Sequence, residues 1–244
     1  ISNKVAVGCV FASSGFFFQA KKIFNDTIPL WGFQRVPFIS RIVNYGKESI
    51  IKGYRKQNRI AIENYENKEV FRSLIEELFG SPTVLLTNYL EATFTNSNAL
   101  LHPARMYSIF KNWQPGDVMG RYIPFYEEWS DEASQLYIEM DRELHQLIEK
   151  LPVDKAYLPY ILDYYESTDA SSLTCKLKEI FANKGYASPM IETPQGWVPD
   201  IKGRYFQEDL GLSLYYIYNM AKELNIQLPT ISTIYEWGQG MIKK

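Results

Sequence analysis

The hydrophobic pattern of the chain changes at Gly80-Ser81-Pro82, and this change limits the fold more than any other feature. Before it, short apolar runs alternate with turn residues, which is typical of buried strands. After it, apolar residues recur at the three- and four-residue spacing of amphipathic helices. We therefore expect an α/β domain over residues 1–81 and an all-helical domain over residues 82–244.

Four strands and one helix are expected before the change of pattern. The strands fall at residues 4–11, 31–42, 47–54 and 59–63. The first two carry closely spaced apolar residues, as buried strands do, whereas the other two alternate. The helix spans residues 67–80, because Asn67 can cap its first turn and Gly80 can end it.

Helices dominate the rest of the chain. They are expected over residues 84–101, 104–113, 125–151, 157–165, 172–183, 209–224 and 229–241. The longest of them, 125–151, places apolar side chains along one inner face. The proline-rich stretch 185–203 is expected to be a loop, and Pro103 is expected to kink the path of the chain.

Composition excludes several classes of function. Hydrophobic residues make up 46% of the 244 residues, which is enough for a substantial core. With a net charge of −2 and no basic run, we expect no nucleic-acid partner. No apolar run reaches the ~20 residues of a membrane-spanning helix, so we expect no membrane partner. Cys9 and Cys175 make no disulfide framework and have no metal-ligand neighbours, which favours a cytoplasmic protein without a metal site.

His102 is the strongest candidate for a proton-transfer residue. It lies in an apolar helical run, with Asn96 and Asn98 before it and Pro103 after it. Such polar groups cost about 1–3 kcal/mol each when buried unpaired, so their presence indicates a polar pocket. The alternative is a histidine that is satisfied within the core. The second histidine, His145, has charged neighbours and is expected at the surface.

Arg204 and Asp209 lie five residues apart at the start of another predicted helix. An arginine can bind a substrate carboxylate through two parallel hydrogen bonds, and an aspartate can hold the imidazole of His102 in one tautomer. The alternative is structural. In that case Asp209 stabilises the helix N-terminus, and Arg204 pairs with Glu208 or Asp200.

The order and spacing of these motifs resemble the opine dehydrogenase family, whose members include octopine and nopaline dehydrogenases. The resemblance rests on Asn-x-Asn-x-x-x-His-Pro at 96–103, Arg-Tyr-x-x-x-Asp at 204–209, a helix beginning near Leu228-Pro229, and the segments 32–41, 185–189 and 199–200. It is weakest from 115 to 180. On composition alone, residues 34–41 would be an ordinary strand with surface arginines.

The resemblance implies a fold and an activity. The family joins an N-terminal Rossmann domain to a C-terminal helical domain, so residues 1–81 would be the C-terminal part of the nucleotide-binding domain. No G-x-G-x-x-G turn follows a strand in this sequence, and we expect the chain to begin partway through the protein. The implied reaction is the NAD- or NADP-dependent reductive condensation of an amino acid with a 2-oxo acid.

By position in these motifs, the resemblance makes His102 the acid/base, Asp209 its orienting carboxylate and Arg204 a residue that positions substrate. Gln34 and Asn98 would line the substrate site, and no residue is assigned to the cofactor. Two alternatives stay open: a hydroxy-acid dehydrogenase with a helical domain, and a non-catalytic helical binding module. The unpaired edge of a half-sheet favours association, which leaves a homodimer open.

Overall fold

The computed structural model describes residues 6–24, 26–182 and 185–243 of the chain. It divides into two compact units, residues 1–95 with 152–158 and residues 96–151 with 159–244. The first unit extends beyond the change of hydrophobic pattern at residues 80–82. Strand β6 (Thr83–Leu85), which follows that change, still belongs to the sheet of the first unit. Among the described residues, no helix is long and apolar enough to cross a membrane.

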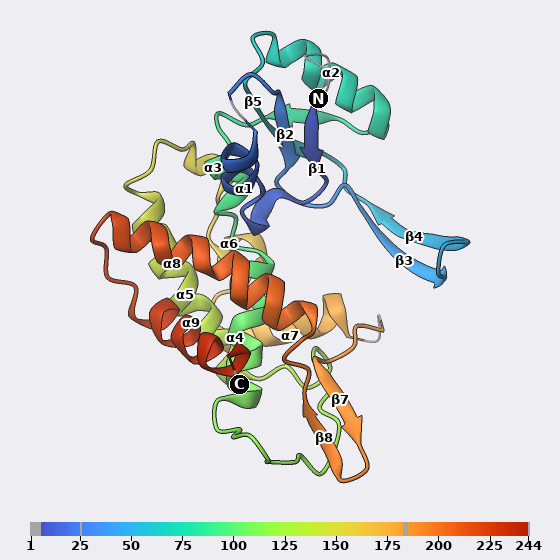
Figure 1. The fold of residues 1–244 in the computed structure, drawn as a ribbon, viewed down its shortest axis with the longest axis vertical. Helices are drawn as coiled ribbons and strands as arrows, with labels where there is room; N and C mark the ends of the chain where they lie inside the picture. Colours follow the sequence, from blue (N-terminus) through green and yellow to red (C-terminus); the bar gives the residue numbers. More distant parts are fainter. Residues whose placement is uncertain (1–5, 25, 183–184, 244) are drawn as a thin grey trace. The chain divides into compact units, whose positions relative to one another are not determined.

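A four-stranded mixed sheet forms the centre of the first unit. Its strands, in spatial order, are β1 (Val7–Cys9), β2 (Leu30–Phe33), β5 (Asn58–Glu63) and β6. The pairs β1–β2 and β5–β6 are parallel, and β2–β5 is antiparallel. Parallel neighbours need a crossover connection. The short helix η1 (Ala12–Ser14) and α1 (Phe16–Ile23) make the first crossover, and α2 (Lys68–Phe79) makes the second (Figure 1).

Alternation along β5 buries both faces of this sheet. Ala61 packs in one cluster with Phe17 of α1. Its neighbours Ile60 and Ile62 point the other way and pack in a second cluster with Ile75 of α2. The strand is therefore covered by one helix on each face, as expected for an α/β sheet.

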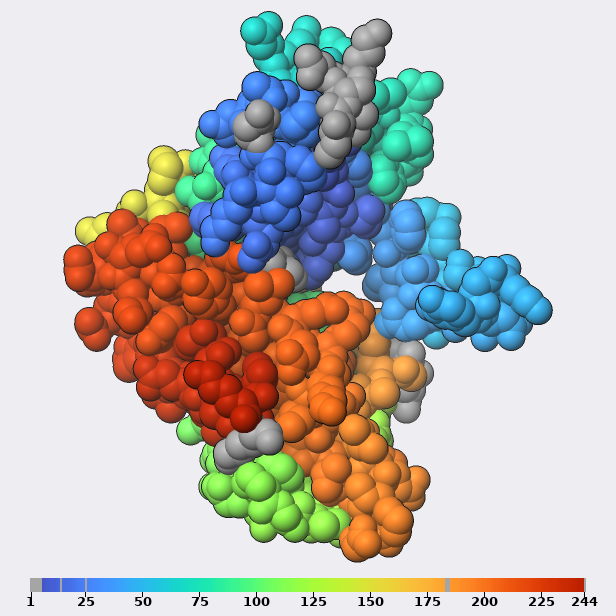
Figure 2. Space-filling model, in the orientation of Figure 1, coloured from blue at the N-terminus to red at the C-terminus, as the bar shows by residue number. Residues whose placement is uncertain are grey.

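The predicted buried strand at residues 31–42 is two separate strands. β2 ends at Phe33, and β3 (Phe38–Asn44) begins only after Pro37, which cannot donate to a strand ladder. β3 pairs with β4 (Glu48–Tyr54) as an isolated antiparallel hairpin, which stands out from the rest of the first unit in Figure 2. Burial of the whole stretch was a wrong expectation, because Ile39 and Ile42 are exposed. The hairpin also exposes Val43, Ile50 and Ile51.

Helices make up most of the second unit. They are α4 (Asn98–Phe110), α5 (Asp131–Ile148), α6 (Ile161–Tyr164), α7 (Ala170–Phe181), the π-helix η3 (Tyr205–Ser213), α8 (Leu214–Glu223) and α9 (Pro229–Ile242). Two short helices, α3 (Leu90–Thr93) and η2 (Lys155–Tyr157), belong to the first unit.

Several helix predictions differ from the structure. The expected helix at 84–101 is interrupted, because β6, α3 and an irregular turn precede α4, which then continues through Pro103. α5 begins at Asp131 rather than at 125, because the Ser130 hydroxyl caps it by accepting from the Ala133 N–H. The expected loop at 185–203 contains the hairpin of β7 (Met190–Thr193) and β8 (Gly196–Pro199). Residues 4–5 and 183, at the ends of two expected elements, lie outside the described residues.

Helix α9 is fixed by contacts with two other helices. At its N-terminus, the buried carboxylate of Glu143 accepts from the N–H groups of Thr230 (2.7 Å) and Ile231 (2.9 Å). Further along, Gly238 lies against Leu210 of η3, since a Cβ at position 238 would come within 1.7 Å of the Leu210 Cδ2 atom. The glycine therefore sets how closely α9 approaches the π-helix.

We expect Gly238→Ala to lower the free energy of unfolding by about 1–3 kcal/mol, because the added methyl group overpacks against the buried Leu210. Gly240→Ala in the same helix is the matched control. Its Cβ meets no atom within 4 Å, and alanine favours a helix over glycine by about 0.5–1 kcal/mol. Urea unfolding of both variants measures the difference, and equal stabilities would contradict this packing.

Candidate active site

Helix α4 and the π-helix η3 bring His102 and Asp209 together, although 107 residues separate them in the chain. Nδ1 of His102 lies 2.7 Å from Oδ2 of Asp209, and each residue is only 7% exposed. The sequence predicted that these two residues act together, and their side chains are indeed in contact. A carboxylate on one ring nitrogen fixes the tautomer and the orientation of an imidazole.

Local packing explains why His102 faces inward. Its neighbours Leu101 and Ala104 are buried, and α4 packs against both α5 and η3. Asn98 is the first residue of α4 and lies one turn before His102, so the two side chains leave the same face of the helix.

The second ring nitrogen of His102 has a partner that sequence reasoning missed. The Tyr126 hydroxyl lies 3.0 Å from Nε2. The rings of Tyr205 and Phe125 pack against the imidazole, with centroids 4.4 and 5.7 Å away. Tyr126 lies in the irregular segment between α4 and α5, and its only signal in the sequence is the cluster of aromatic residues at 125–129.

These contacts define the protonation of the cluster. A carboxylate can only accept, so we assign the hydrogen to Nδ1 of His102, which leaves Nε2 to accept from the Tyr126 hydroxyl. Burial raises the pKa of Tyr126 well above its usual value of 10, and the phenol therefore keeps its proton at neutral pH. The result is a buried chain of hydrogen bonds from Tyr126 through His102 to Asp209.

Arg105, three residues after His102 on α4, holds the segment that carries Tyr126. Its guanidinium donates to the carbonyl oxygens of Phe125 (3.0 Å) and Glu128 (2.7 Å). Burial lowers the pKa of Arg105 to about 10, which leaves it charged at neutral pH. A cation bound to carbonyls on both sides of Tyr126 restrains the backbone of that residue.

Arg204 makes no hydrogen bond to this buried cluster. Its side chain is 80% exposed, and its Nε donates to Oε2 of Glu208 at 3.0 Å. That hydrogen bond raises the pKa of Arg204 above its ordinary value. The pairing is the structural alternative expected from the sequence, and a role of Arg204 in binding substrate stays a prediction.

Gln34 lies in the first unit, where its amide is buried. Its Nε2 donates to the carbonyl oxygens of Glu91 (3.0 Å) and Tyr157 (2.9 Å), and its Oε1 accepts from Arg59. These bonds tie the end of β2 to two segments that lie far from it in sequence. Whether Gln34 also lines a substrate site stays a prediction.

His145 is buried, so the expectation that it lies at the surface is wrong. Its ring stacks on Tyr160, with centroids 3.6 Å apart, and its Nε2 lies 3.8 Å from Oδ1 of Asp141. His145 was expected at the surface because charged neighbours in the sequence usually indicate a solvated helix face. Here the neighbouring Glu143 is itself buried, since it caps α9.

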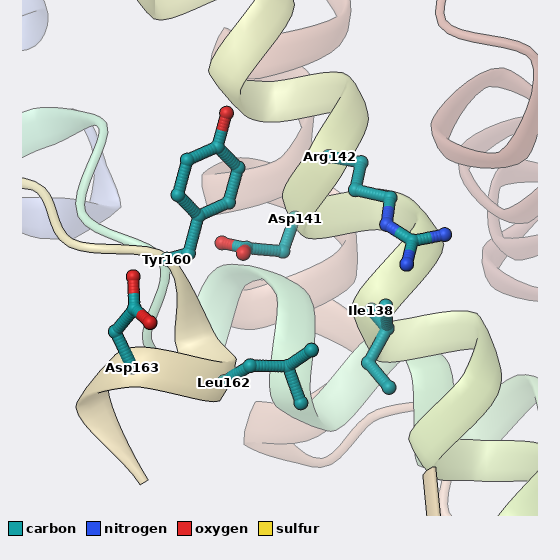
Figure 3. Close-up of a pocket in the computed structure, with 6 residues that line it drawn as sticks. All are labelled: Ile138, Asp141, Arg142, Tyr160, Leu162 and Asp163. Carbon is teal, nitrogen blue, oxygen red and sulfur yellow. The ribbon is translucent and has the colours of Figure 1, made fainter. Parts of the chain in front are cut away.

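Asp141 is the centre of a second buried polar cluster. Its Oδ1 accepts from Nδ2 of Asn96 at 2.7 Å, and its Oδ2 accepts from the Ile161 N–H at 2.9 Å. Burial nevertheless raises the pKa of Asp141 to about 6. Figure 3 shows the pocket of about 250 Å³ beside it, lined by Ile138, Asp141, Arg142, Tyr160, Leu162 and Asp163. In the part of the chain that the structure describes, no three His, Cys, Asp or Glu side chains gather as a metal site requires.

A family model described as "NAD/NADP octopine/nopaline dehydrogenase, alpha-helical domain" matches residues 85–242, which is more than half of the chain. The chain belongs to this family. The resemblance inferred from the motifs is confirmed, and the matched range contains His102, Tyr126, Arg204 and Asp209.

Relatives in the family match nearly all of this chain. An uncharacterized protein, y4xO, of Sinorhizobium fredii is 26% identical over 96% of this chain and 67% of its own length. The tauropine dehydrogenase of Arabella iricolor is 25% identical over 94% of this chain and 62% of its own length. The corresponding values for the opine dehydrogenase of Haliotis discus hannai are 23%, 94% and 61%. The chain thus spans about three fifths of the length of these two dehydrogenases.

Solved structures share the fold at low sequence identity. An octopine dehydrogenase determined with NADH and L-arginine superposes with a TM-score of 0.80 and 19% identity, over 100% of this chain and 64% of that one. Yersinopine dehydrogenase gives a TM-score of 0.65 and 12% identity, over 98% and 63%. The expected fold class, a partial Rossmann-type α/β domain followed by a helical domain, is confirmed.

The raised pKa of Asp141 predicts a pH-dependent stability. Between about pH 4 and pH 6, the folded protein holds this proton more tightly than the unfolded chain, so the free energy of unfolding falls as pH rises through that window. The fall is about 2–3 kcal/mol, and we expect Asp141→Asn to abolish it. Glu139→Gln, on the same helix at a surface hydrogen bond, is the control. Urea unfolding at several pH values tests this, and an unchanged slope in Asp141→Asn would refute it.

Proposed function

We propose that the chain is part of an NAD- or NADP-dependent dehydrogenase that acts on CH–NH bonds and reductively condenses an amino acid with a 2-oxo acid. The observation that carries the proposal is the buried hydrogen-bond chain Tyr126–His102–Asp209 in a member of this family. Octopine dehydrogenase has been determined with NADH, L-arginine and pyruvate, and yersinopine dehydrogenase with NADP⁺. These ligands support the choice of cofactor and substrate class.

His102 moves the proton in this reaction. Since Nδ1 is held by Asp209, Nε2 is the nitrogen that donates or accepts, once the substrate has replaced the Tyr126 hydroxyl as its partner. As an imidazolium, His102 polarises the carbonyl oxygen of the oxo acid and then the imine. As a neutral imidazole, it takes the proton from the substrate amine in the reverse direction. Asp209 stabilises the imidazolium and keeps the ring in the required tautomer.

The first unit fits one part of a dinucleotide site. Ligands of parallel α/β sheets bind outside the carboxyl ends of the strands. The chain leaves the carboxyl end of β1 and reaches Ser13, whose hydroxyl is buried without a hydrogen-bond partner among the described residues. Ser13 is therefore the residue that we assign to hold the cofactor. When bound, NADH or NADPH supplies the hydride.

Arg204 binds a substrate carboxylate in this proposal. Its ion pair with Glu208 is exposed, so exchanging that partner for a substrate costs little, and its planar guanidinium suits two parallel hydrogen bonds. Asn98 offers its side-chain amide one turn before His102. Gln34, whose amide is engaged within the first unit, contributes indirectly by fixing the segments around it.

A cytoplasmic location and a homodimer are further parts of the proposal. Cys9 and Cys175 are both free thiols, which suits a reducing compartment. The exposed apolar side chains of the β3–β4 hairpin support association between copies of the chain.

His102→Ala should lower kcat by about 100- to 10,000-fold, the usual contribution of a general acid/base. The assay follows oxidation of NADH or NADPH by the whole natural protein, with pyruvate and a panel of amino acids. His145→Gln is the matched control, because this second buried histidine lies outside the cluster, and it should keep near-wild-type activity. Rates of His102→Ala within about threefold of wild type would contradict the assignment of His102 as the general acid/base. Turnover without any amine would point to a hydroxy-acid dehydrogenase instead.

Arg204→Lys should raise KM for one carboxylate substrate much more than for the other. Lysine keeps the charge but lacks the planar guanidinium that forms two parallel hydrogen bonds with a carboxylate. Arg121→Lys is the matched control, since Arg121 makes a comparable exposed ion pair with Glu128. Steady-state kinetics with each substrate varied in turn provide the comparison. If both variants behave alike, Arg204 has only a structural role.

A further inference from the structure

The Tyr126 hydroxyl occupies the ring nitrogen through which His102 exchanges its proton. It lies 3.0 Å from Nε2, and the residue is 3% exposed. Within the described residues, this hydroxyl makes no other hydrogen bond. Its one hydrogen bond among those residues is to His102.

The ring of Tyr126 is held on several sides. Trp129 stacks on it, with 9° between the planes and 5.8 Å between the centroids. Phe181 of α7 and Tyr186 pack against it at 4.8 and 5.4 Å. Since these rings come from separate segments, they hold the ring of Tyr126 beside His102.

The backbone on either side of Tyr126 is held by a buried cation. Arg105 donates to the carbonyl oxygens of Pro124, Phe125 and Glu128 and to the Ser108 hydroxyl. Burying a charge is costly unless hydrogen bonds compensate it, and here backbone carbonyls supply them. The same helix, α4, thus carries both His102 and the residue that fixes the partner of His102.

We propose that Tyr126 is a positioning residue for His102, anchored by Arg105; its catalytic meaning rests on the function proposed above. The hydroxyl donates to Nε2 when the imidazole is neutral and accepts from Nε2–H when it is protonated. Tyr126 therefore holds the imidazole through Nε2, while Asp209 holds it through Nδ1, and the two contacts together fix the orientation of the ring.

The other groups around the imidazole come from η3, from α4 itself and from Phe125. Asp209 bonds to Nδ1, the Tyr205 ring packs edge-on, and Arg204 is exposed and paired with Glu208. α4 contributes the charge of Arg105, and the Phe125 ring packs against the imidazole with the centroids 5.7 Å apart. All of these groups remain when Tyr126 becomes phenylalanine, so a change at the ring nitrogens of His102 reports the hydroxyl alone.

The test is ¹⁵N NMR of the His102 ring nitrogens in the whole natural protein, with ¹⁵N-labelled histidine. The His102 signals are the ones lost in His102→Ala. Tyr126→Phe should change the ¹⁵N chemical shift of Nε2, because that nitrogen loses its hydrogen-bond partner. The Nδ1–H tautomer should persist, because Asp209 fixes it. Tyr107→Phe is the matched control, since it removes an α4 hydroxyl that makes no hydrogen bond within the described residues.

A second variant tests the anchor. Arg105→Lys keeps the charge but loses the planar donors, so the Nε2 signal of His102 should move in the same direction as in Tyr126→Phe, by a smaller amount. Because the positive charge is kept, this change reports the lost anchor rather than the charge.

Kinetics link the contact to the reaction. In the direction that oxidises the opine, where His102 accepts a proton, Tyr126→Phe should lower kcat/KM, whereas Tyr107→Phe should not. An unchanged Nε2 signal in Tyr126→Phe would overturn the inference. A fully active His102→Ala would overturn the proposed function instead, so the two failures are distinguishable.

Discussion

The buried contact between His102 and Asp209 is the interaction on which the second unit depends. If either side chain moved away, the other would lose its hydrogen-bond partner while still buried, which costs free energy. The contact therefore requires α4 and the π-helix η3 to keep a fixed separation. Glu143 secures the start of α9, and Gly238 lets α9 lie directly on η3 beside Asp209. Packing at a distance from the histidine thus maintains its geometry.

Three buried titratable side chains in this unit bind backbone groups. Arg105 binds carbonyl oxygens in the segment before α5, Asp141 binds the Ile161 N–H, and Glu143 binds N–H groups at the start of α9. Each of these side chains comes from α4 or α5 and holds backbone groups that have few partners of their own, either at the start of a helix or in an irregular segment. These contacts restrain the starts of α6 and α9 and the segment that carries Tyr126.

The sequence was sufficient for most helices of the second unit, because these rest on local periodicity, and the resemblance to a family was needed to pair His102 with Asp209. It was insufficient where long-range contacts override local pattern. Tyr126 fell inside the expected helix 125–151, whereas it lies before α5, and nothing local connects it to His102. His145 looks solvated until its neighbour Glu143 is seen to cap a helix 87 residues away. Residues 31–42 look like one apolar strand, and only the pairing of β3 with β4 shows that part of them is exposed.

Over the same length along its axis, the π-helix η3 contains one residue more than an α-helix would. Deleting a single residue between Asp209 and Leu214 would allow this stretch to rewind as an ordinary α-helix. Asp209 would then rotate by about 100° relative to α8 and leave Nδ1 of His102 without its carboxylate. The contact between His102 and Asp209 therefore depends on the number of residues in this stretch as well as on their identity. A chain that kept both side chains but lost this one insertion would hold them apart.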